Sequence, residues 1–249
     1  MGKIVAIGGG EIGRPGYPVE TTKIDKEILR LTGKEHPRLL FVPTAMSDSE
    51  SYFEVIRKHF GKRLGCETDV LHLIRERPSR KEIEEKLLDC DAVYVGGGNT
   101  LKMMRVWRKT GFDQMLKRAY KRGTVLSGMS AGSICWFRWG NSDSRKFLNP
   151  SAPLIRISGL GLINASHCPH YDVEKYRRRG LKDMMKRTSG VAIALDNFCA
   201  IEIVADKYRV ISSKPSANAY KAYWRAHKYH EEVIEKVSEF RSLCDLLAK

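Results

Sequence analysis

The chain has 249 residues, of which 42% are hydrophobic, enough to form a sizeable core and to exclude global disorder. It contains 44 lysines and arginines against 29 aspartates and glutamates, and the formal charge of +15 favours anionic partners, whether nucleic acid, anionic lipid or acidic small molecules. The basic residues are scattered and accompany no zinc-binding spacing or RNA-binding signature, so we expect no nucleic-acid partner.

The six cysteines lie far apart, without metal-ligand spacing, and most stand in apolar surroundings. Such thiols are typical of a reduced, cytoplasmic protein. The chain begins almost directly with an apolar strand, without the apolar region and cleavage site of a signal peptide, and no apolar run approaches a membrane span. We therefore expect a cytoplasmic location and no membrane partner.

Short apolar runs alternate with helical patterns along the chain. The runs predict strands over Ile4–Ile7, Leu39–Val42, Val70–Leu73, Ala92–Val95, Val125–Ser127, Leu162–Ala165, Val191–Leu195 and Ala200–Val204, with a small hairpin near Tyr208–Ile211. The helical patterns cover Lys23–Leu31, Glu50–Phe60, Arg80–Leu88, Thr100–Lys109, Phe112–Lys121, Val173–Lys186 and Arg225–Leu247. This alternation predicts one α/β domain over residues 1–249, with a mostly parallel sheet covered by helices on both faces.

The first glycine cluster, Gly8-Gly-Gly10-Glu-Ile-Gly13, follows a predicted strand and matches the dinucleotide-binding pattern. A dinucleotide site also needs a helix that opens within the motif. The next residues, Arg14-Pro-Gly-Tyr-Pro18, cannot start a helix because of their two prolines. We therefore expect no nucleotide cofactor there.

A second glycine cluster, Gly96-Gly-Gly-Asn-Thr100, also follows a strand. It is compatible with a tight turn into a helix capped by Asn99 or Thr100. Its backbone N–H groups could also face a ligand closely and form part of an oxyanion hole. A phosphate cradle is a third interpretation, although the Lys-Ser/Thr pair of a P-loop is missing.

The third cluster, Gly128-Met-Ser130-Ala-Gly132, lies between an apolar strand and the helix-compatible residues Ser133–Phe137. Strand, G-x-S-x-G and helix together are typical of a nucleophile elbow. The N–H of Ala131 would then lie at a helix N-terminus, where it can stabilise an oxyanion. The pattern predicts that Ser130 is a nucleophile rather than part of an ordinary turn.

A nucleophilic serine requires a base and a group that orients this base. Of the seven histidines, His167 and His170 follow a strand that points to the active-site edge of the sheet. The other five precede the elbow or lie in the charged C-terminal segment. The residues alone do not decide between His167 and His170.

Four motifs resemble, in order and spacing, the peptidase E (aspartyl dipeptidase) family of serine peptidases, to which cyanophycinase is related. The resemblance extends from the first strand to about Ile203, and the motifs are Gly96-Gly-Gly-Asn-Thr-Leu101, Gly128-Met-Ser-Ala-Gly-Ser133, Asn141-Ser-Asp143 and Cys168-Pro-His-Tyr171. It implies a fold of the class I glutamine-amidotransferase (flavodoxin-like) type. It also implies cofactor-free hydrolysis of short peptides with an N-terminal aspartate.

The same resemblance implies roles for individual residues. Ser130 would be the nucleophile and His170 the base, with His167 structural. The oxyanion donors would be the N–H groups of Ala131 and Gly98. The acid would come from the turn Ala194-Leu-Asp-Asn-Phe198, on Asp196 or, in the other register, on Asn197.

The resemblance places Asp143 near the site, where it would orient groups or contact substrate. Asn99 is expected to contact the substrate. Recognition of an acidic N-terminal residue requires a cation, and Arg177, Arg178 or Arg179 could supply it from the helix that follows His170. Two other functions remain compatible with the sequence: a cyanophycinase-like or other hydrolase, and a non-catalytic ligand-binding module. The C-terminal segment could also form a homodimer contact.

Overall fold

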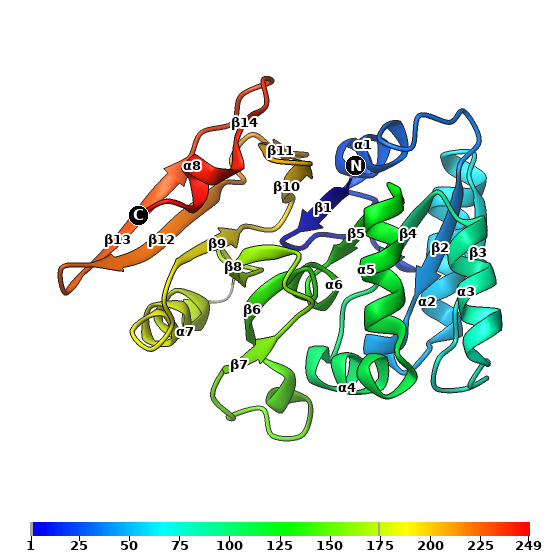
Figure 1. The fold of residues 1–249 in the computed structure, drawn as a ribbon, viewed down its shortest axis with the longest axis horizontal. Helices are drawn as coiled ribbons and strands as arrows, with labels where there is room; N and C mark the ends of the chain where they lie inside the picture. Colours follow the sequence, from blue (N-terminus) through cyan, green and yellow to red (C-terminus); the bar gives the residue numbers. More distant parts are fainter. Residues whose placement is uncertain (1, 174) are drawn as a thin grey trace.

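The computed structural model describes residues 2–173 and 175–249 and divides the strands between two sheets. The first sheet comprises β1 (Lys3–Ile7), β2 (Arg38–Val42), β3 (Glu67–Val70), β4 (Ala92–Val95), β5 (Val125–Met129), β10 (Cys199–Val204), β11 (Lys207–Ser212) and β14 (Arg241–Ser242). Its strand order is β14-β11-β10-β1-β5-β4-β2-β3 (Figure 1). Five neighbouring strands run parallel, namely β1, β5, β4, β2 and β3. On the other side of β1, strands β10, β11 and β14 extend the sheet with antiparallel pairing.

The second sheet comprises β6 (Phe137–Ser142), β7 (Ile155–Ser158), β8 (Ile163–Cys168), β9 (Val191–Leu195), β12 (Ala219–Arg225) and β13 (Lys228–Ile234). Its order is β13-β12-β9-β8-β6-β7, and the central strands β6, β8 and β9 are parallel. Figure 1 shows this sheet beside the first, with the β12–β13 hairpin on its far side.

The helices cover both faces of the first sheet and part of the second sheet. They are α1 (Thr22–Arg30), α2 (Glu50–Ile56), α3 (Arg80–Asp89), α4 (Thr100–Thr110), α5 (Phe112–Arg122), α6 (Ala131–Ile134), α7 (Lys175–Met185) and α8 (Leu243–Leu247), with 3₁₀ turns η1 (Thr44–Met46) and η3 (Ser144–Phe147) and the π-helical η2 (Arg57–Arg63). Apolar residues of α3, α4 and α5 pack on one face, and those of α1, α2 and η2 pack on the other. The predicted α/β class, with helices on both faces, is confirmed.

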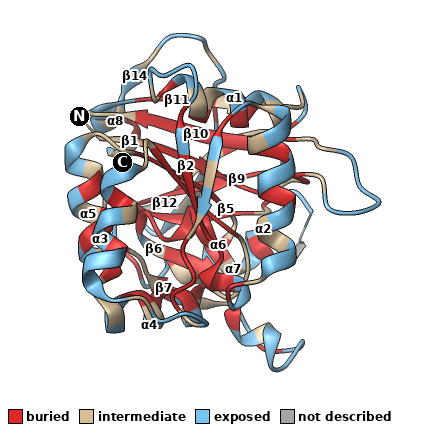
Figure 2. Cartoon of the chain, turned by 90° about the vertical axis from the view of Figure 1, so that its right-hand side faces the viewer, coloured by how far each residue is buried: buried red, intermediate tan, exposed pale blue. Residues whose placement is uncertain are grey.

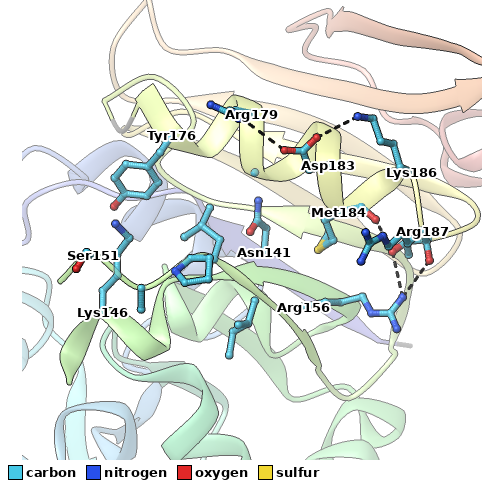
Figure 3. Close-up of a pocket in the computed structure, with 16 residues that line it drawn as sticks. Asn141, Lys146, Ser151, Arg156, Tyr176, Arg179, Asp183, Met184, Lys186 and Arg187 are labelled. Atoms are coloured by element: carbon cyan, nitrogen blue, oxygen red, sulfur yellow. Dashed lines mark hydrogen bonds and ion pairs between the residues drawn. The ribbon is translucent and has the colours of Figure 1, made fainter. Parts of the chain in front are cut away.

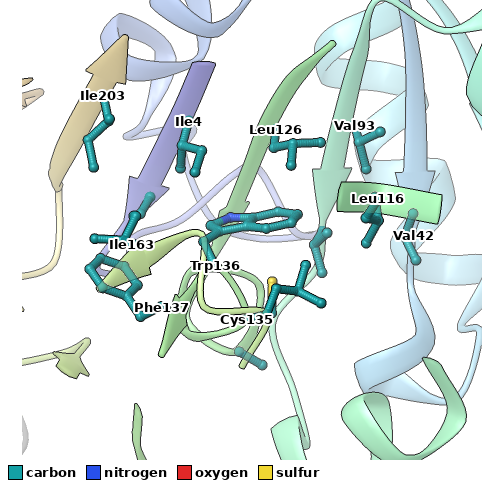
Figure 4. Close-up of a cluster of buried hydrophobic side chains, with 14 of the residues drawn as sticks. Ile4, Val42, Val93, Leu116, Leu126, Cys135, Trp136, Phe137, Ile163 and Ile203 are labelled. Atoms are coloured by element: carbon teal, nitrogen blue, oxygen red, sulfur yellow. The ribbon is translucent and has the colours of Figure 1, made fainter. Parts of the chain in front are cut away.

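Burial follows this layering, since buried residues gather in the strands and exposed residues on the outer helix surfaces (Figure 2). The largest buried side chains include Trp136, which directly follows the short helix α6 and its C-cap. In Figure 4 its indole ring lies between Ile4 and Leu126 of the first sheet and Phe137, the first residue of β6. Trp136 thus belongs to the apolar layer that joins the two sheets.

The predicted C-terminal helix over Arg225–Leu247 is wrong. This region contains the end of β12, the strand β13, the short β14 and only five helical residues in α8. The turn between β12 and β13 is formed by Ala226 and His227, both with positive φ (48° and 60°), as a two-residue hairpin requires. Pairing of β12 with β9, and cross-strand rings such as Tyr223 on His230, outweigh the helical charge pattern.

Several element boundaries also differ from the predictions. The helix after the elbow ends at Ile134, and its expected continuation enters strand β6, which the sequence did not indicate. The strand expected over Val70–Leu73 lies earlier, at β3. The helix expected over Val173–Lys186 is described from Lys175 to Met185, and residue 174 lies outside the described residues. Among the described residues, no helix combines the length and apolarity needed to cross a membrane.

Candidate active site

Ser130 lies at a sharp turn between β5 and α6, with φ 57° and ψ −111°. A Cβ atom on Gly128 would lie 2.5 Å from the carbonyl oxygen of Gly132, and one on Gly132 would lie 2.0 Å from that of Val95. Both positions therefore require glycine. The Ser130 N–H donates to the Ile7 carbonyl at 3.1 Å, which ties the turn to the end of β1. This is the strand–turn–helix geometry of a nucleophile elbow.

His170 joins this serine to an asparagine. Its Nε2 atom lies 2.9 Å from Ser130 Oγ, and its Nδ1 atom lies 2.7 Å from Asn197 Oδ1. Because an amide oxygen only accepts hydrogen bonds, Nδ1 must carry the proton, which leaves Nε2 of the neutral ring as the acceptor for the serine hydroxyl. The Asn197 N–H donates to Asp172 Oδ1 at 2.8 Å. The arrangement has the geometry of a serine–histidine–asparagine triad.

The cluster Gly8–Gly10 supports this histidine–asparagine pair. A Cβ atom on Gly9 would lie 2.0 Å from Asn197 Oδ1 and 2.4 Å from His170 Nδ1. The Gly9 carbonyl accepts the Phe198 N–H at 2.8 Å. No helix opens within this motif, since α1 begins only at Thr22. The sequence argued against a dinucleotide site, but it did not predict that these glycines pack against the histidine and the asparagine. Their position directly after a strand could have indicated such packing.

Asp196 faces away from the catalytic arrangement. Its Oδ2 atom accepts the Asn218 N–H at 2.9 Å and the Tyr220 hydroxyl at 3.4 Å, both from the region of β12. Its side chain is buried, and burial raises the pKa of this carboxyl above its usual range. Because Ser130 and Asn197 occupy the two ring nitrogens of His170, Asn197 takes the position that was predicted for Asp196 or Asn197.

Asp143, which is partly exposed, forms an ion pair with the buried Arg177, with 2.9 Å between Oδ2 and Nη2. Another guanidinium nitrogen of Arg177 donates to the Asn141 carbonyl at 3.0 Å, and the Arg177 side chain is 1% exposed. These contacts connect α7 to the end of β6. They do not place Asp143 at the ring of His170.

Arg178 is also engaged within the protein. Its guanidinium pairs with Glu231 of β13 and lies over the rings of Tyr171 and Tyr220, at 4.4 and 4.8 Å from their centroids. Arg179 differs from its two neighbours because its side chain is 91% exposed. Of the three consecutive arginines, Arg179 is therefore the most accessible to a ligand.

The second glycine cluster lies beside Ser130. A Cβ atom on Gly97 would lie 3.5 Å from Ser130 Cβ and 4.0 Å from its Oγ, and the Gly97 N–H donates to the hydroxyl of Tyr52 at 3.3 Å. Gly98 has φ 131°, a backbone conformation that favours glycine. The Ala131 N–H is at the first position of α6, where helical N–H groups have no partner within the helix. Ala131 directly follows Ser130, whereas a Cβ atom on Gly98 would lie 2.5 Å from the Ala45 carbonyl oxygen, so the role of both N–H groups as oxyanion donors stays a prediction. The contact with Tyr52 was not predicted.

Asn99 serves the fold at this edge of the sheet. Its Oδ1 atom accepts the Lys102 N–H at 3.0 Å and caps α4, while its Nδ2 donates to the Ser144 carbonyl at 3.2 Å. Both ends of the amide are therefore engaged by the protein. These contacts do not point to the expected substrate contact.

His167 is buried and stacks on Phe137, with 4.4 Å between the ring centroids. Its Nδ1 lies 2.8 Å from the Ile193 carbonyl and its Nε2 lies 2.8 Å from Ser133 Oγ. Burial lowers the pKa of His167 to about 3, so the ring is neutral. His167 therefore joins β8, β9 and α6, which fits the expected structural role.

Comparison with known proteins supports the motifs. A family model described as peptidase family S51 matches residues 4–211. YgaJ, an uncharacterized peptidase of Bacillus subtilis, is 34% identical over 237 residues, which cover 93% of this chain and 96% of that protein. A peptidase E from Nostoc is 29% identical over 149 residues, or 59% of this chain and 57% of its own length.

The fold is shared with solved peptidase structures. A peptidase from an acI-B1 actinobacterium superposes with a TM-score of 0.72 at 20% identity, over 97% of both chains. A putative peptidase E from Listeria monocytogenes superposes with a TM-score of 0.62 at 21% identity, over 85% of this chain and 98% of that chain. The resemblance that the motifs predicted is confirmed. The chain belongs to peptidase family S51 and is a serine peptidase.

Proposed function

We propose that the chain hydrolyses short peptides, with Ser130 as nucleophile, His170 as general base and Asn197 as the group that orients the base. The observation that carries this proposal is the continuous contact from Ser130 Oγ to His170 Nε2, at 2.9 Å, and from His170 Nδ1 to Asn197 Oδ1, at 2.7 Å. These distances fall within the range that proton transfer requires.

The reaction would proceed through an acyl-enzyme. His170 takes the proton of Ser130 as Oγ attacks the scissile carbonyl, and the imidazolium then gives this proton to the leaving amine. The N–H groups of Ala131 and Gly98 would stabilise the oxyanion, and one such donor typically lowers the barrier by about 3 kcal/mol. Water, activated by the same histidine, then hydrolyses the ester. Asn197 can hold the Nδ1–H tautomer but contributes no negative charge.

Replacement of Ser130 by alanine tests this mechanism. Ser130→Ala should lower kcat by a factor on the order of 10⁶ while the far-ultraviolet circular dichroism spectrum stays unchanged, because the triad acts as a unit. Ser127→Ala is the matched control, since this buried serine of the same strand bonds the Val93 carbonyl at 2.9 Å. Turnover by the Ser130→Ala protein, with the control also active, would contradict the proposed nucleophile.

We propose dipeptides with an N-terminal aspartate as the substrates. One relative supports this choice by name: a probable alpha-aspartyl dipeptidase of Drosophila melanogaster that is 28% identical over 134 residues, 53% of this chain and 52% of its own length. The formal charge of +15 also favours an acidic substrate. A panel of Asp-X dipeptides, β-aspartyl dipeptides and aryl esters would separate this specificity from those of a cyanophycinase-like hydrolase and an esterase.

Arg179 is the cation that we propose for binding the aspartate side chain. Its ion pair with Asp183 is long, at 3.9 Å, so its guanidinium can exchange this partner for a substrate carboxylate. Arg179→Gln should raise KM for Asp-X dipeptides at least tenfold and leave KM for neutral substrates within twofold. Lys182→Gln, one turn further along α7, is the charge-matched control. Equal effects of Arg179→Gln on acidic and neutral substrates would count against this role.

The non-catalytic binding module that the sequence left open does not fit membership of a peptidase family, although the amide of Asn197 at the position of the expected acid favours it. Reaction with a fluorophosphonate decides between the two functions. An active serine should be labelled covalently at Ser130, and the Ser130→Ala protein should remain unlabelled. Absence of labelling in the unmodified protein at high probe concentration would support the binding module.

A further inference from the structure

A cavity of about 820 Å³ lies between helix α7 and the segment from η3 to β7 (Figure 3). This volume falls within the range of small-molecule binding sites. The residues that line the cavity do not include Ser130, His170 or Asn197. The cavity therefore does not contain the triad, although its lining includes Arg179, which is proposed above to bind the aspartate side chain of the substrate.

The floor of this cavity contains an unpaired hydrogen-bond donor. Asn141 of β6 is 1% exposed, and among the described residues its Nδ2 atom has no hydrogen-bond partner. A buried polar group without a partner destabilises the fold, so such a donor beside a cavity indicates an acceptor that comes from outside the protein. Figure 3 shows the Asn141 amide between α7 and the segment beneath it.

Gly180 allows Leu154 to pack closely against α7 beside this amide. It lies inside α7, where glycine is less favourable than alanine. A Cβ atom at this position would lie 2.5 Å from Leu154 Cδ1 and 3.3 Å from Asn141 Nδ2. The flexible end of Leu154 must therefore move aside for a ligand atom to reach the amide, and a methyl group on residue 180 would hinder this movement.

Cations surround the cavity. The lining contains five basic residues and a single acidic residue, Asp183; the basic residues are Lys146, Arg156, Arg179, Lys186 and Arg187. Arg156 and Arg187 lie at one end of the cavity in Figure 3, and the Lys186 ammonium pairs with Asp183, with 3.2 Å between Nζ and Oδ1. This exposed ion pair is weak, so Lys186 can exchange Asp183 for a ligand. The Arg156 guanidinium is fixed, because it donates to the Arg187 carbonyl at 3.3 Å and to Thr188 Oγ1 at 3.1 Å. Such an excess of positive charge favours a ligand with more than one negative charge.

The same cavity has an apolar wall formed by Pro153, Leu154 and Met184. We propose that the cavity is a second binding site, separate from the catalytic serine, for a small dianion that carries an apolar group, such as a phosphate monoester. The phosphate binds at the end formed by Arg156 and Lys186, the Asn141 amide donates to a ligand oxygen, and the apolar group covers the wall.

Calorimetric titration of the Ser130→Ala protein tests this site without turnover, so its outcome is independent of the proposed peptidase activity. The probes are phenyl phosphate, inorganic phosphate and benzoate at low ionic strength. We expect phenyl phosphate to bind at least tenfold more tightly than either of the others, because only this probe combines two charges with an apolar group. Absence of phenyl phosphate binding, or equally tight binding of benzoate, would overturn the proposal.

Paired substitutions locate the binding. Arg156→Gln with Lys186→Gln should weaken phenyl phosphate binding at least tenfold, whereas the charge-matched pair Lys109→Gln with Lys121→Gln, on α4 and α5, should keep it within twofold. Equal weakening of phenyl phosphate binding by both pairs would mean that only the net charge matters, and this would contradict a defined site.

Gly180→Ala favours the helix and should still weaken phenyl phosphate binding severalfold. Unchanged affinity in this variant would refute the role of Asn141.

Discussion

Asn197 is the residue that distinguishes this site from a triad with an acid. Asn197→Asp would place a carboxylate beside His170 Nδ1, at the present contact distance of 2.7 Å. A carboxylate stabilises the imidazolium and so raises the pKa of the histidine relative to the unmodified protein. Because the base must be neutral to accept the serine proton, the acid limb of the kcat/KM profile should move to higher pH, and kcat above this limb should rise.

The pH profiles of Asn197→Asp and of the unmodified protein provide the measurement. Asn164→Asp introduces the same charge on the exposed side of β8 and should leave the profile unchanged. A profile of Asn197→Asp that coincides with that of the unmodified protein would mean that Asn197 does not contact the base during turnover.

The sequence could predict Ser130 and His170 but not the choice between Asp196 and Asn197. Ser130 lies in a local pattern of strand, glycines and helix that leaves little freedom. Asp196 and Asn197 are adjacent, and neighbouring side chains at the end of a strand point in opposite directions. The choice depends on register against β12, which presents Asn218 and Tyr220 to Asp196 and leaves Asn197 to His170. Only long-range pairing carries this information.

At the scale of elements, the β12–β13 hairpin supports the segment that carries His170. Glu231 of β13 accepts the Tyr171 hydroxyl at 2.7 Å and pairs with Arg178, so it contacts both the residue after the histidine and helix α7. The hairpin lies beyond the residues matched by the family model. It therefore adds a support that the family motifs do not contain.

Glu231→Gln should lower kcat about tenfold and change KM little, because loss of the charge loosens the hold on Tyr171 and on the position of the base. Glu232→Gln is the matched control: the neighbouring residue accepts the Tyr223 hydroxyl at 2.8 Å. Steady-state kinetics of both variants provide the measurement, and equal kcat values for the two would show that this contact does not position His170.

The β12–β13 hairpin was also the element that the sequence failed to predict. From Val233 onward the apolar residues recur at spacings of three and four, as in a helix, and local preference alone cannot exclude one. Pairing with β9 and the positive φ angles of Ala226 and His227 decide for strands. The buried strands of the first sheet were predictable, because short continuous apolar runs are typical of strands that are covered on both faces.

At the scale of the whole molecule, the charge of +15 should assist the capture of acidic substrates. Raising the ionic strength from about 0.01 to 0.15 M shortens the screening length from about 30 to 8 Å. We expect KM for an Asp-X dipeptide to rise severalfold over this range, and KM for a neutral substrate to change little. A parallel change for the two substrates would assign the salt effect to the enzyme's stability instead of substrate attraction.

The proposed triad is assembled from both sheets. Ser130 follows β5 of the first sheet, whereas His170 and Asn197 follow β8 and β9 of the second. The two parts meet where the Gly8 carbonyl accepts the His170 N–H at 3.2 Å. Catalytic activity therefore depends on the contact between the two sheets. A partly unfolded molecule that lost this contact could keep most of its hydrogen-bonded strands and still be inactive.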